Sequence, residues 1–144
     1  MPTMTDKICL ITGATSGIGL ATARALAREG ATIIAVGRNA QKGAAMVAKL
    51  RQAADNPAVE FMAADLSVQA QVRHLAQEFS GRYARLDVLV NNAGIGYGAL
   101  FQMSTAEKLK EVFDINFVAP FIFTQYIAKL MVRQRSGSII RMSF

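Results

Sequence analysis

The chain has little of several residue types that would define other classes of protein. Its single cysteine, Cys9, lies within an apolar run, so no internal disulfide can form and the thiol is expected to be buried. No run of eighteen uninterrupted apolar residues is present, so no membrane span is expected. The first residues lack the charged-then-apolar layout of a secretory signal. These absences favour a globular protein of the reducing cytoplasm.

Polar composition argues against two further classes of partner. The 16 Lys and Arg residues outnumber the 10 Asp and Glu residues, but they are scattered singly and form no basic run with interleaved aromatics. We therefore expect no nucleic-acid partner, although a mild positive field would draw in a small phosphorylated ligand. The only histidine, His74, lies off the apolar face of its expected helix with no metal-ligand spacing around it, so no metal site is predicted.

Short apolar runs alternate with stretches of helical periodicity along the chain. One helical face, for example, carries Val68, Val72, Leu75, Ala76 and Phe79. The apolar runs predict strands at 7–12, 31–36, 58–63, 86–90 and from about 138. The periodic stretches predict helices at 17–29, 39–54, 68–79 and 104–133.

This alternation predicts an α/β fold. Strands joined by helices of this length form βαβ units, whose right-handed crossovers give a parallel sheet with helices on both faces. Continuously apolar strands fit a sheet covered on both sides, and Ile139, Ile140 and Met142 are likewise expected to begin a buried strand. We predict one domain over residues 1–144, a doubly wound parallel sheet truncated after the start of its fifth strand.

Local signals predict where three of the helices begin. Asn39 and Ser67 are candidate N-caps for the second and third helices. Ser104, with Glu107 three residues on, forms a capping box for the fourth.

One polar residue, Asn116, falls on the apolar face of the last predicted helix. A buried amide without partners would cost about 1–3 kcal/mol, so a hydrogen-bond partner is expected. Pro120 has no N–H and frees the Asn116 carbonyl four residues before it, which predicts a local bend. From the residues alone, Asn116 is a core amide bonded to the disturbed backbone.

The junction of the first strand and first helix, "ITGATSGIG", holds Gly13, Gly17 and Gly19. A residue without Cβ is needed for three purposes here. It allows a tight turn, it lets a diphosphate approach the backbone N–H groups, and it lets the helix pack closely against the strand. The helix N-terminus adds unpaired donors and a partial positive charge. The spacing differs from G-x-G-x-x-G, and it is not a P-loop because no Lys follows the second glycine. Such a turn can also be a structural strand–helix connection.

Three motifs, in order, resemble the classical short-chain dehydrogenases/reductases. The glycine turn matches T-G-x-x-x-G-x-G over residues 12–19, "AADLS" follows the third strand and "NNAG" follows the fourth. The resemblance runs from about Thr5 to the last residue and implies a Rossmann-type domain for a nicotinamide cofactor. It implies these cofactor-binding residues: Gly13, Thr15, Ser16, Gly17, Ile18 and Gly19 in the turn, Asp65 and Leu66 facing the adenine, and Asn92, Ala93 and Gly94 supporting the cofactor and the sheet. Without the family, Asp65 could be a turn residue and "NNAG" an ordinary loop.

The end of the second strand bears on which nicotinamide cofactor is bound. An acidic residue about twenty positions past the glycines binds a ribose 2′-hydroxyl, whereas an arginine there accommodates a 2′-phosphate. Here Gly37 stands where the family's acidic residue is usual, and Arg38 follows it. An arginine–phosphate contact is charge-assisted, so NADP(H) is predicted over NAD(H). The alternative is that Arg38 is a solvated loop cation.

The resemblance also implies a reaction, hydride transfer between the nicotinamide and a small-molecule carbonyl or alcohol substrate. "DINFVAPF" matches the family segment whose asparagine, here Asn116, helps hold a water in a catalytic proton relay. The family's catalytic Tyr and Lys lie four apart on a helix after the fifth strand, for which no residues remain. Tyr126 and Lys129 are three apart and precede that strand, so they are interpreted as ordinary helix residues.

The last residues align with the family's G-x-I-V-N-x-S-S run. Ser143 falls on the first serine, Phe144 on the second, which is the catalytic one, and Arg141 replaces the asparagine. We therefore expect the cofactor-binding half of an oxidoreductase, inactive alone, with exposed apolar flanks, marginal stability, and a homo-oligomer only for a full-length form. The alternatives are a non-catalytic dinucleotide-binding or interaction module and, more weakly, a flavodoxin-like regulator.

Overall fold

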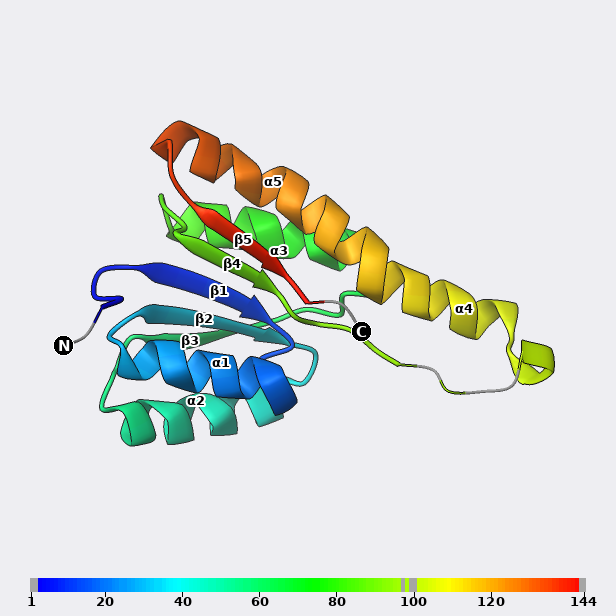
Figure 1. Ribbon diagram of the computed structural model, residues 1–144, viewed down its shortest axis with the longest axis horizontal. Helices are drawn as coiled ribbons and strands as arrows, with labels where there is room; N and C mark the ends of the chain where they lie inside the picture. The colour runs from blue at the N-terminus through cyan, green and yellow to red at the C-terminus, as the bar shows by residue number, and fades with distance from the viewer. Residues whose placement is uncertain (1–2, 97, 99–100, 143–144) are drawn as a thin grey trace.

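The computed structural model describes residues 3–96, 98 and 101–142. Strands and helices alternate as the sequence predicts (Figure 1). In chain order the elements are β1 (Ile8–Thr12), α1 (Gly17–Arg28), β2 (Thr32–Gly37), α2 (Ala40–Ala54), β3 (Val59–Ala63), α3 (Gln69–Arg82), β4 (Val88–Asn91), a 3-10 turn (Phe101–Met103), α4 (Ala106–Phe113), a π-helical segment (Asp114–Val118), α5 (Ala119–Gln134) and β5 (Ser138–Arg141).

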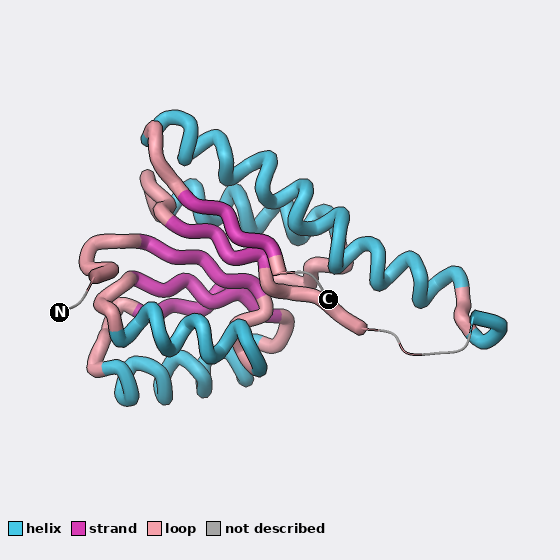
Figure 2. The backbone as a smooth tube through the Cα atoms, in the orientation of Figure 1, coloured by secondary structure: helices cyan, strands magenta, loops and turns pink. Residues whose placement is uncertain are grey.

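The five strands form one parallel sheet in the order β3-β2-β1-β4-β5 (Figure 2). β1 pairs with β2 on one side, where Ile11 lies opposite Ala35, and with β4 on the other, where Ile11 lies opposite Val90. The chain winds outward from β1 to β3 and then starts again at β4 in the other direction. This arrangement is the predicted doubly wound fold, and its switch point lies between β1 and β4.

Helices cover both faces of the sheet and enclose two apolar cores. α1 and α2 pack on the face that includes Cys9 and Ile33, while α3 and α5 pack on the face that includes Leu10 and Ile34. Neighbouring residues of one strand enter different cores because strand side chains alternate between faces. Cys9 is fully buried, as predicted, and burial raises the pKa of its thiol to about 11.

α2 lies close to the sheet because two glycines leave room for one aromatic ring. A Cβ at Gly43 would lie 2.4 Å from ring atoms of Phe61, and a Cβ at Gly37 would lie 3.2 Å from the same ring. The ring of this β3 residue therefore fills the space between α2 and the end of β2. Any side chain at position 43 would push α2 away from β3.

The single helix predicted over 104–133 is one continuous helical stretch whose hydrogen-bond pattern changes. In the π-helical segment the Ala119 N–H bonds to the Asp114 carbonyl, five residues back. Pro120 comes next and has no N–H, so the α-helical bond to the Asn116 carbonyl cannot form. The predicted disturbance is present as a π-helical insertion just before the proline.

The cap predictions were right for α2 and wrong for α4. The Asn39 side chain accepts a hydrogen bond from the Lys42 N–H at 3.0 Å and begins α2 as predicted. The cap of α4 is Thr105 and not Ser104, because the Thr105 hydroxyl accepts the 3.1 Å bond from the N–H three residues on.

α3 also begins differently from the prediction. Its N-cap residue is Val68, and the predicted cap Ser67 instead donates its hydroxyl to the Asp65 carboxylate at 2.7 Å. Val68 was placed on the buried face but is 40% exposed, whereas Val72 and Phe79 are fully buried. The predicted buried face of this helix is therefore confirmed from Val72 onward.

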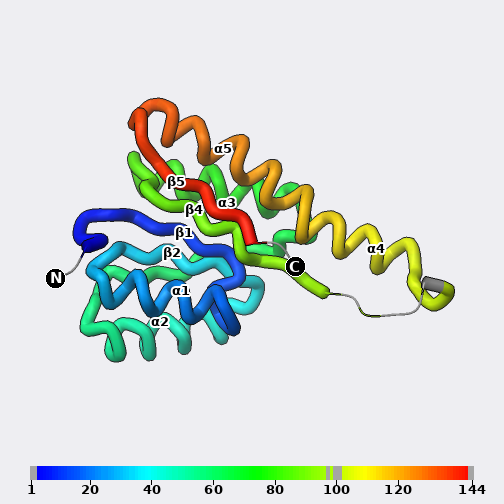
Figure 3. The backbone as a smooth tube through the Cα atoms, viewed as in Figure 1, coloured from blue at the N-terminus to red at the C-terminus, as the bar shows by residue number. Residues whose placement is uncertain are grey.

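β5 and α4 expose apolar side chains. Among the strands that the structure describes, β5 pairs only with β4. Ile139 and Ile140 are 45% and 48% exposed, so the prediction of a buried strand is wrong. α4 has no buried residue because it extends beyond the carboxyl edge of the sheet (Figure 3). The expected exposure of apolar flanks on the strand and the long helix is confirmed.

By length and composition, the helical stretch Ala106–Gln134 could cross a membrane. Its C-terminal part, however, packs against α3 and contributes Phe123, Ile127 and Leu130 to one of the two cores. That packing is the usual position of a core helix in a globular domain.

Gly43→Ala is expected to reduce the free energy of unfolding. Overpacking against the Phe61 ring costs about 1–3 kcal/mol, and the better helix propensity of alanine offsets up to about 1 kcal/mol, so a net loss results. Urea unfolding of both proteins measures the difference.

Gly81→Ala in α3 is the matched control, because no atom lies within 4 Å of a Cβ there and alanine is expected to stabilise the helix slightly. Equal stability of the Gly43→Ala and Gly81→Ala variants would contradict the close packing of α2 against Phe61.

Candidate functional site

The residues predicted to bind the cofactor gather at one edge of the sheet. Gly13 follows β1, Arg38 follows β2, Asp65 follows β3 and Asn92 follows β4, so all four come after the carboxyl ends of neighbouring strands (Figure 1). In open α/β sheets, ligands bind outside these ends and at the switch point. The candidate site is therefore the carboxyl edge of the sheet where the β1–α1 turn meets the loop after β4.

The β1–α1 turn depends on glycine for its conformation and for its packing. Gly13 and Gly17 have φ of 64° and 56°, a region that side chains rarely adopt. A Cβ at Gly13 would lie 2.9 Å from the Cα of Ala93, and a Cβ at Gly19 would lie 2.2 Å from the Gly13 carbonyl oxygen. The turn thus lies directly against the loop after β4.

Hydrogen bonds fasten the turn to that loop. Thr12 Oγ1 accepts hydrogen bonds from the N–H groups of Asn92 (3.0 Å) and Ala93 (2.9 Å). In return, the Asn92 side-chain amide donates to the carbonyl oxygens of Thr12 and Gly13, both at 3.2 Å. Thr12 and Asn92 are almost completely buried. We call these four bonds the Thr12–Asn92 bridge.

Thr12 is a functional position that the sequence prediction missed. It is the first letter of the matched glycine motif, and a threonine at the end of an apolar strand was the available signal. Its hydroxyl group gives it a positioning role, because it holds the loop after β4 in place.

The N-terminus of α1 is open toward the site. Ser16 is the N-cap residue, but its side chain makes no capping hydrogen bond, unlike the caps of α2 and α4. The first bond to the cap carbonyl is donated by Leu20, so the N–H groups of residues 17–19 have no acceptor within the helix. Ile18, in this first turn, has a side chain that is 55% exposed.

One buried atom beside this turn has no partner. Among the described residues, Asn92 Oδ1 is the only buried side-chain nitrogen or oxygen that lacks a hydrogen bond. The same amide group lies against Gly19, where a Cβ would come within 2.4 Å of Asn92 Nδ2. Uncapped donors, a helix macrodipole and close-approach glycines fit a diphosphate group.

The corner after β2 and β3 combines one anion and one cation. The hydrogen bond from the Ser67 hydroxyl is the main cause that lowers the pKa of Asp65 below its ordinary value, and the positive charge of Arg38 adds to it. Arg38 therefore lies near enough to Asp65 for their charges to interact, while its side chain stays exposed to solvent. Leu66 packs against the apolar core beside them.

Position 37, at the end of β2, is closely packed. A Cβ there would lie 2.9 Å from Cγ2 of Thr15 and 3.2 Å from the Phe61 ring, so these side chains would have to shift to admit one. An acidic side chain that could bind a ribose 2′-hydroxyl is absent from this position. The nearest charged residue along the chain is Arg38.

Asn116 lies in the π-helical segment and is half-buried. The predicted partner of its side chain was wrong, because the side chain bonds to the loop after β4 and not to the disturbed helix backbone. Its side chain accepts a hydrogen bond from the Ile95 N–H and donates one to the Ile95 carbonyl, both at 2.8 Å. The Asn116 main-chain carbonyl accepts a hydrogen bond from Arg141 Nη2 at 3.0 Å, and the guanidinium lies 5.1 Å from the centre of the Phe117 ring. Asn116 thus links the loop after β4 to the long helix.

The structure separates other candidate side chains from this edge. Tyr126 in α5 packs against the α3–α5 core, with the Lys129 ammonium 5.4 Å from its ring centre. His74 is solvent-exposed and lies 3.9 Å from Glu78. Among the described residues no group of His, Cys, Asp and Glu side chains could hold a metal ion. The predicted match of Ser143 to the first serine of the family motif concerns a residue outside the part of the chain that the structure describes.

A doubly wound sheet with an uncapped helix N-terminus behind a glycine turn at its switch point is typical of α/β domains that bind nucleotides. Residues 7–143 match the family model described as short chain dehydrogenase. The chain therefore belongs to the short-chain dehydrogenase family.

Named relatives agree with this family. The chain is 43% identical over 143 residues to the 3beta-hydroxysteroid dehydrogenase of Mediterraneibacter gnavus, covering 96% of this chain and 49% of the relative. It is 37% identical over 138 residues to the 3-oxoacyl-acyl-carrier-protein reductase FabG of Thermotoga maritima, covering 95% and 55%. The chain thus spans about half the length of these curated relatives. A solved metagenomic short-chain oxidoreductase in complex with NADP matches with a TM-score of 0.90 at 30% identity, covering 97% of this chain and 63% of that one.

Ser67→Ala is expected to raise the pKa of Asp65, because the charged carboxylate loses the hydroxyl donor. A lowered folded-state pKa stabilises the protein above the unfolded pKa, and that contribution disappears as pH falls through the folded pKa. The variant is therefore expected to be less stable by about 1 kcal/mol near neutral pH, with the difference vanishing in acid.

NMR titration of the Asp65 carboxyl group, together with urea unfolding at neutral and acidic pH, measures both effects. Ser67→Thr keeps the hydroxyl and serves as the control. A stability difference that persists unchanged to low pH would show that Ser67 acts through something other than the charge of Asp65.

Proposed function

We propose that the chain is the cofactor-binding part of an NADP(H)-dependent oxidoreductase that transfers a hydride between the nicotinamide and a carbonyl or alcohol substrate. The observation that carries this proposal is the first turn of α1 at the switch point of the sheet, where the Ser16 side chain makes no capping hydrogen bond and the N–H groups of residues 17–19 have no acceptor within the helix. Membership of the short-chain dehydrogenase family and the likeness to an NADP complex support it.

In this proposal the cofactor supplies the hydride chemistry, and the chain binds and orients the cofactor. The first-turn amides of α1 donate to the diphosphate, which the helix macrodipole favours. Asp65 and Leu66, after β3, face the adenine. Asn92, Ala93 and Gly94, after β4, form the floor of the site, and the Thr12–Asn92 bridge keeps that floor against the turn.

The proposed preference for NADP(H) rests on the absence of a carboxylate and on charge. Position 37 is a glycine packed against Thr15 and Phe61, so no carboxylate is present there to bind a 2′-hydroxyl. Arg38, which is exposed beside Asp65, is assigned to the 2′-phosphate. A guanidinium can bind a phosphate with two parallel hydrogen bonds, which gives strong discrimination.

Asn116 is proposed to hold a water of the proton relay. Its side-chain oxygen and nitrogen each already bond to Ile95, and we assign the water to its main-chain carbonyl oxygen. That oxygen already accepts one bond from Arg141, and a carbonyl oxygen has a second lone pair. Pro120 makes this possible because it leaves the carbonyl without its helical donor.

The 144 residues are proposed to bind the cofactor without turning it over. Tyr126 and Lys129 precede β5 and lie on the core helix, so they do not form the family's acid–base pair. A non-catalytic dinucleotide-binding module is the second candidate, favoured by Arg141, which occupies one site on the Asn116 carbonyl. For a full-length form we propose a homo-oligomer, because Phe113 and Phe121 expose an apolar face of the helix that a second subunit could cover. We also propose that the protein acts in the cytoplasm.

Calorimetric titration of the chain with NADPH and NADH tests the proposed function. NADPH is expected to bind more tightly, and Arg38→Ala is expected to weaken NADPH binding about tenfold or more while leaving NADH binding within about twofold. Arg73→Ala, an exposed arginine on α3, is the control and is expected to change neither value.

Absence of binding to both nucleotides would refute the assignment of a dinucleotide site. An unchanged NADPH-to-NADH ratio in Arg38→Ala would remove the role of Arg38 alone. Turnover of a carbonyl panel by the chain itself would overturn the proposal that it is inactive.

A further inference from the structure

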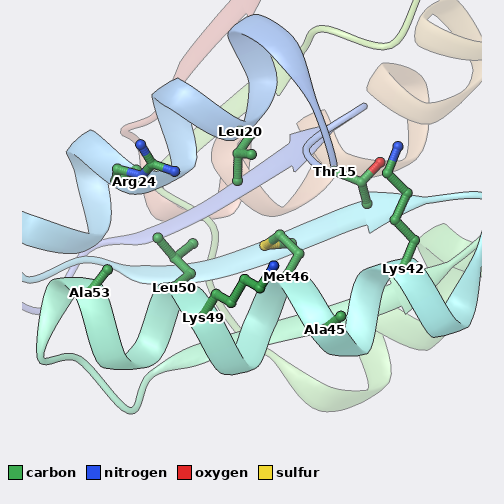
Figure 4. Close-up of a pocket in the computed structure, with 9 residues that line it drawn as sticks. All are labelled: Thr15, Leu20, Arg24, Lys42, Ala45, Met46, Lys49, Leu50 and Ala53. Atoms are coloured by element: carbon green, nitrogen blue, oxygen red, sulfur yellow. The ribbon is translucent and has the colours of Figure 1, made fainter.

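A groove of about 260 Å³ runs between α1 and α2 (Figure 4). Its apolar floor is formed by Leu20 of α1 and by Met46 and Leu50 of α2. Met46 and Leu50 are only 7% and 2% exposed and belong to the core between these helices and the sheet. On α2 the lining residues extend from Lys42 to Ala53, a helical length of about 16 Å. The groove is therefore long and narrow, and core packing holds its floor in place.

The two helices that form the groove carry positive charge and no negative charge. Their sequences contain no Asp or Glu, and their cationic residues are Arg24, Arg28, Lys42, Lys49 and Arg51. Three of these line the groove: Arg24, Lys42 and Lys49. Within the described part of the chain, Arg24 and Lys49 make no ion pair, and both are exposed. The groove thus combines an apolar floor with an uncompensated positive rim.

Arg24 and Lys49 border the groove from different helices. Arg24 comes from α1 and Lys49 from α2, and both lie further from the β1–α1 turn than Lys42, which lies beside Thr15 at the other end (Figure 4). The aliphatic stems of such side chains cover apolar surface while their charged ends stay in water. An anionic group at this part of the rim would therefore meet a cation from each helix, directly above apolar floor.

The size of the groove favours a small ligand over a protein partner. A stable protein interface buries about 800 Å² on each side, and a helix with its side chains is about 10 Å wide. A volume of 260 Å³ lies instead near the lower end, about 300 Å³, of the range for small-molecule sites. A single alkyl chain fits a long, narrow apolar floor, and the flexible side chain of Met46 can adapt to it.

We propose that the groove between α1 and α2 binds an anionic amphiphile with one alkyl chain, a medium-chain fatty carboxylate. The carboxylate bonds to Arg24 and Lys49, and the chain lies over Leu20, Met46 and Leu50. Charge-assisted hydrogen bonds select the anionic head, and burial of methylene groups selects the chain. The inference does not depend on the proposed function, because the two cations that bind the head lie away from the glycine turn.

Calorimetric titration of the chain with decanoate, below the concentration at which it forms micelles, tests the inference. Decanoate is expected to bind saturably and at least about tenfold more tightly than hexanoate, because each fully buried methylene group contributes about fourfold. The neutral amphiphile decyl maltoside, which has the same chain length, is expected to bind at least about tenfold more weakly. In methyl NMR spectra, decanoate is expected to shift the signals of Met46 and Leu50.

Substitutions on the rim test the two cations without touching the core. Arg24→Gln and Lys49→Gln are each expected to weaken decanoate binding about fivefold, whereas Lys49→Arg keeps the charge and is expected to retain most of the affinity. Arg28→Gln is the matched control, because Arg28 is an exposed arginine one turn after Arg24 on the same helix but does not line the groove.

Absence of saturable decanoate binding, or equal affinity for decyl maltoside, would overturn the inference. An equal loss in Arg28→Gln would also overturn it, because it would indicate only the general positive field of the two helices. Binding to vesicles of anionic phospholipid without binding to decanoate would show that a membrane surface, and not a single amphiphile, is the ligand. The proposed function fails separately, through the absence of NADPH and NADH binding to the unmodified chain.

Discussion

The candidate site depends on the Thr12–Asn92 bridge between β1 and the loop after β4. Four hydrogen bonds cross the switch point, and both side chains that make them are buried. Loss of either side chain would leave buried polar groups unpaired, at about 1–3 kcal/mol for each group. The bridge therefore fixes how far the glycine turn stands from its neighbouring loop. That distance determines whether the first turn of α1 can present its free N–H groups to a ligand.

A second feature of the site is the close packing around the end of β2. Thr15 and Phe61 pack closely against the glycine at position 37, and Phe61 also packs against the glycine at position 43. The same contacts bring α2 close to the end of β2. A glycine therefore stands where a carboxylate would bind a 2′-hydroxyl, and the next residue, Arg38, supplies a positive charge beside Asp65.

The sequence predicted the order of strands and helices and the doubly wound topology, and the cofactor role of the residues that gather at the carboxyl edge of the sheet stays a prediction. These follow from strong signals, since apolar runs and helical periodicity extend over many residues and the glycine motif occurs at a strand–helix junction. The caps at Ser67 and Ser104 were wrong because neighbouring residues compete for the same role. Ser67 bonds to Asp65, and Thr105 caps α4 one residue later.

Two other features depended on tertiary contacts that no local pattern contains. Ile139 stands beside Ile140 in a short apolar run, which predicted a buried strand. It is exposed because, among the described strands, its strand pairs only with β4. The polarity of Asn116 indicated a hydrogen-bond partner, and the structure identifies that partner as Ile95, which lies 21 residues earlier in the chain. Such a partner is set by the path of the loop after β4 and by the π-helical turn, which place the two residues together.

Amide NMR of the chain during titration with adenosine diphosphate tests most directly whether the uncapped first turn of α1 binds a diphosphate. Saturable shifts are expected for the amides of Gly17, Ile18 and Gly19, with none for the first turn of α4, which the Thr105 side chain caps. If a large excess of the nucleotide moves none of the three glycine-turn amides, or moves those of α4 equally, the α1 N-terminus is not the binding site.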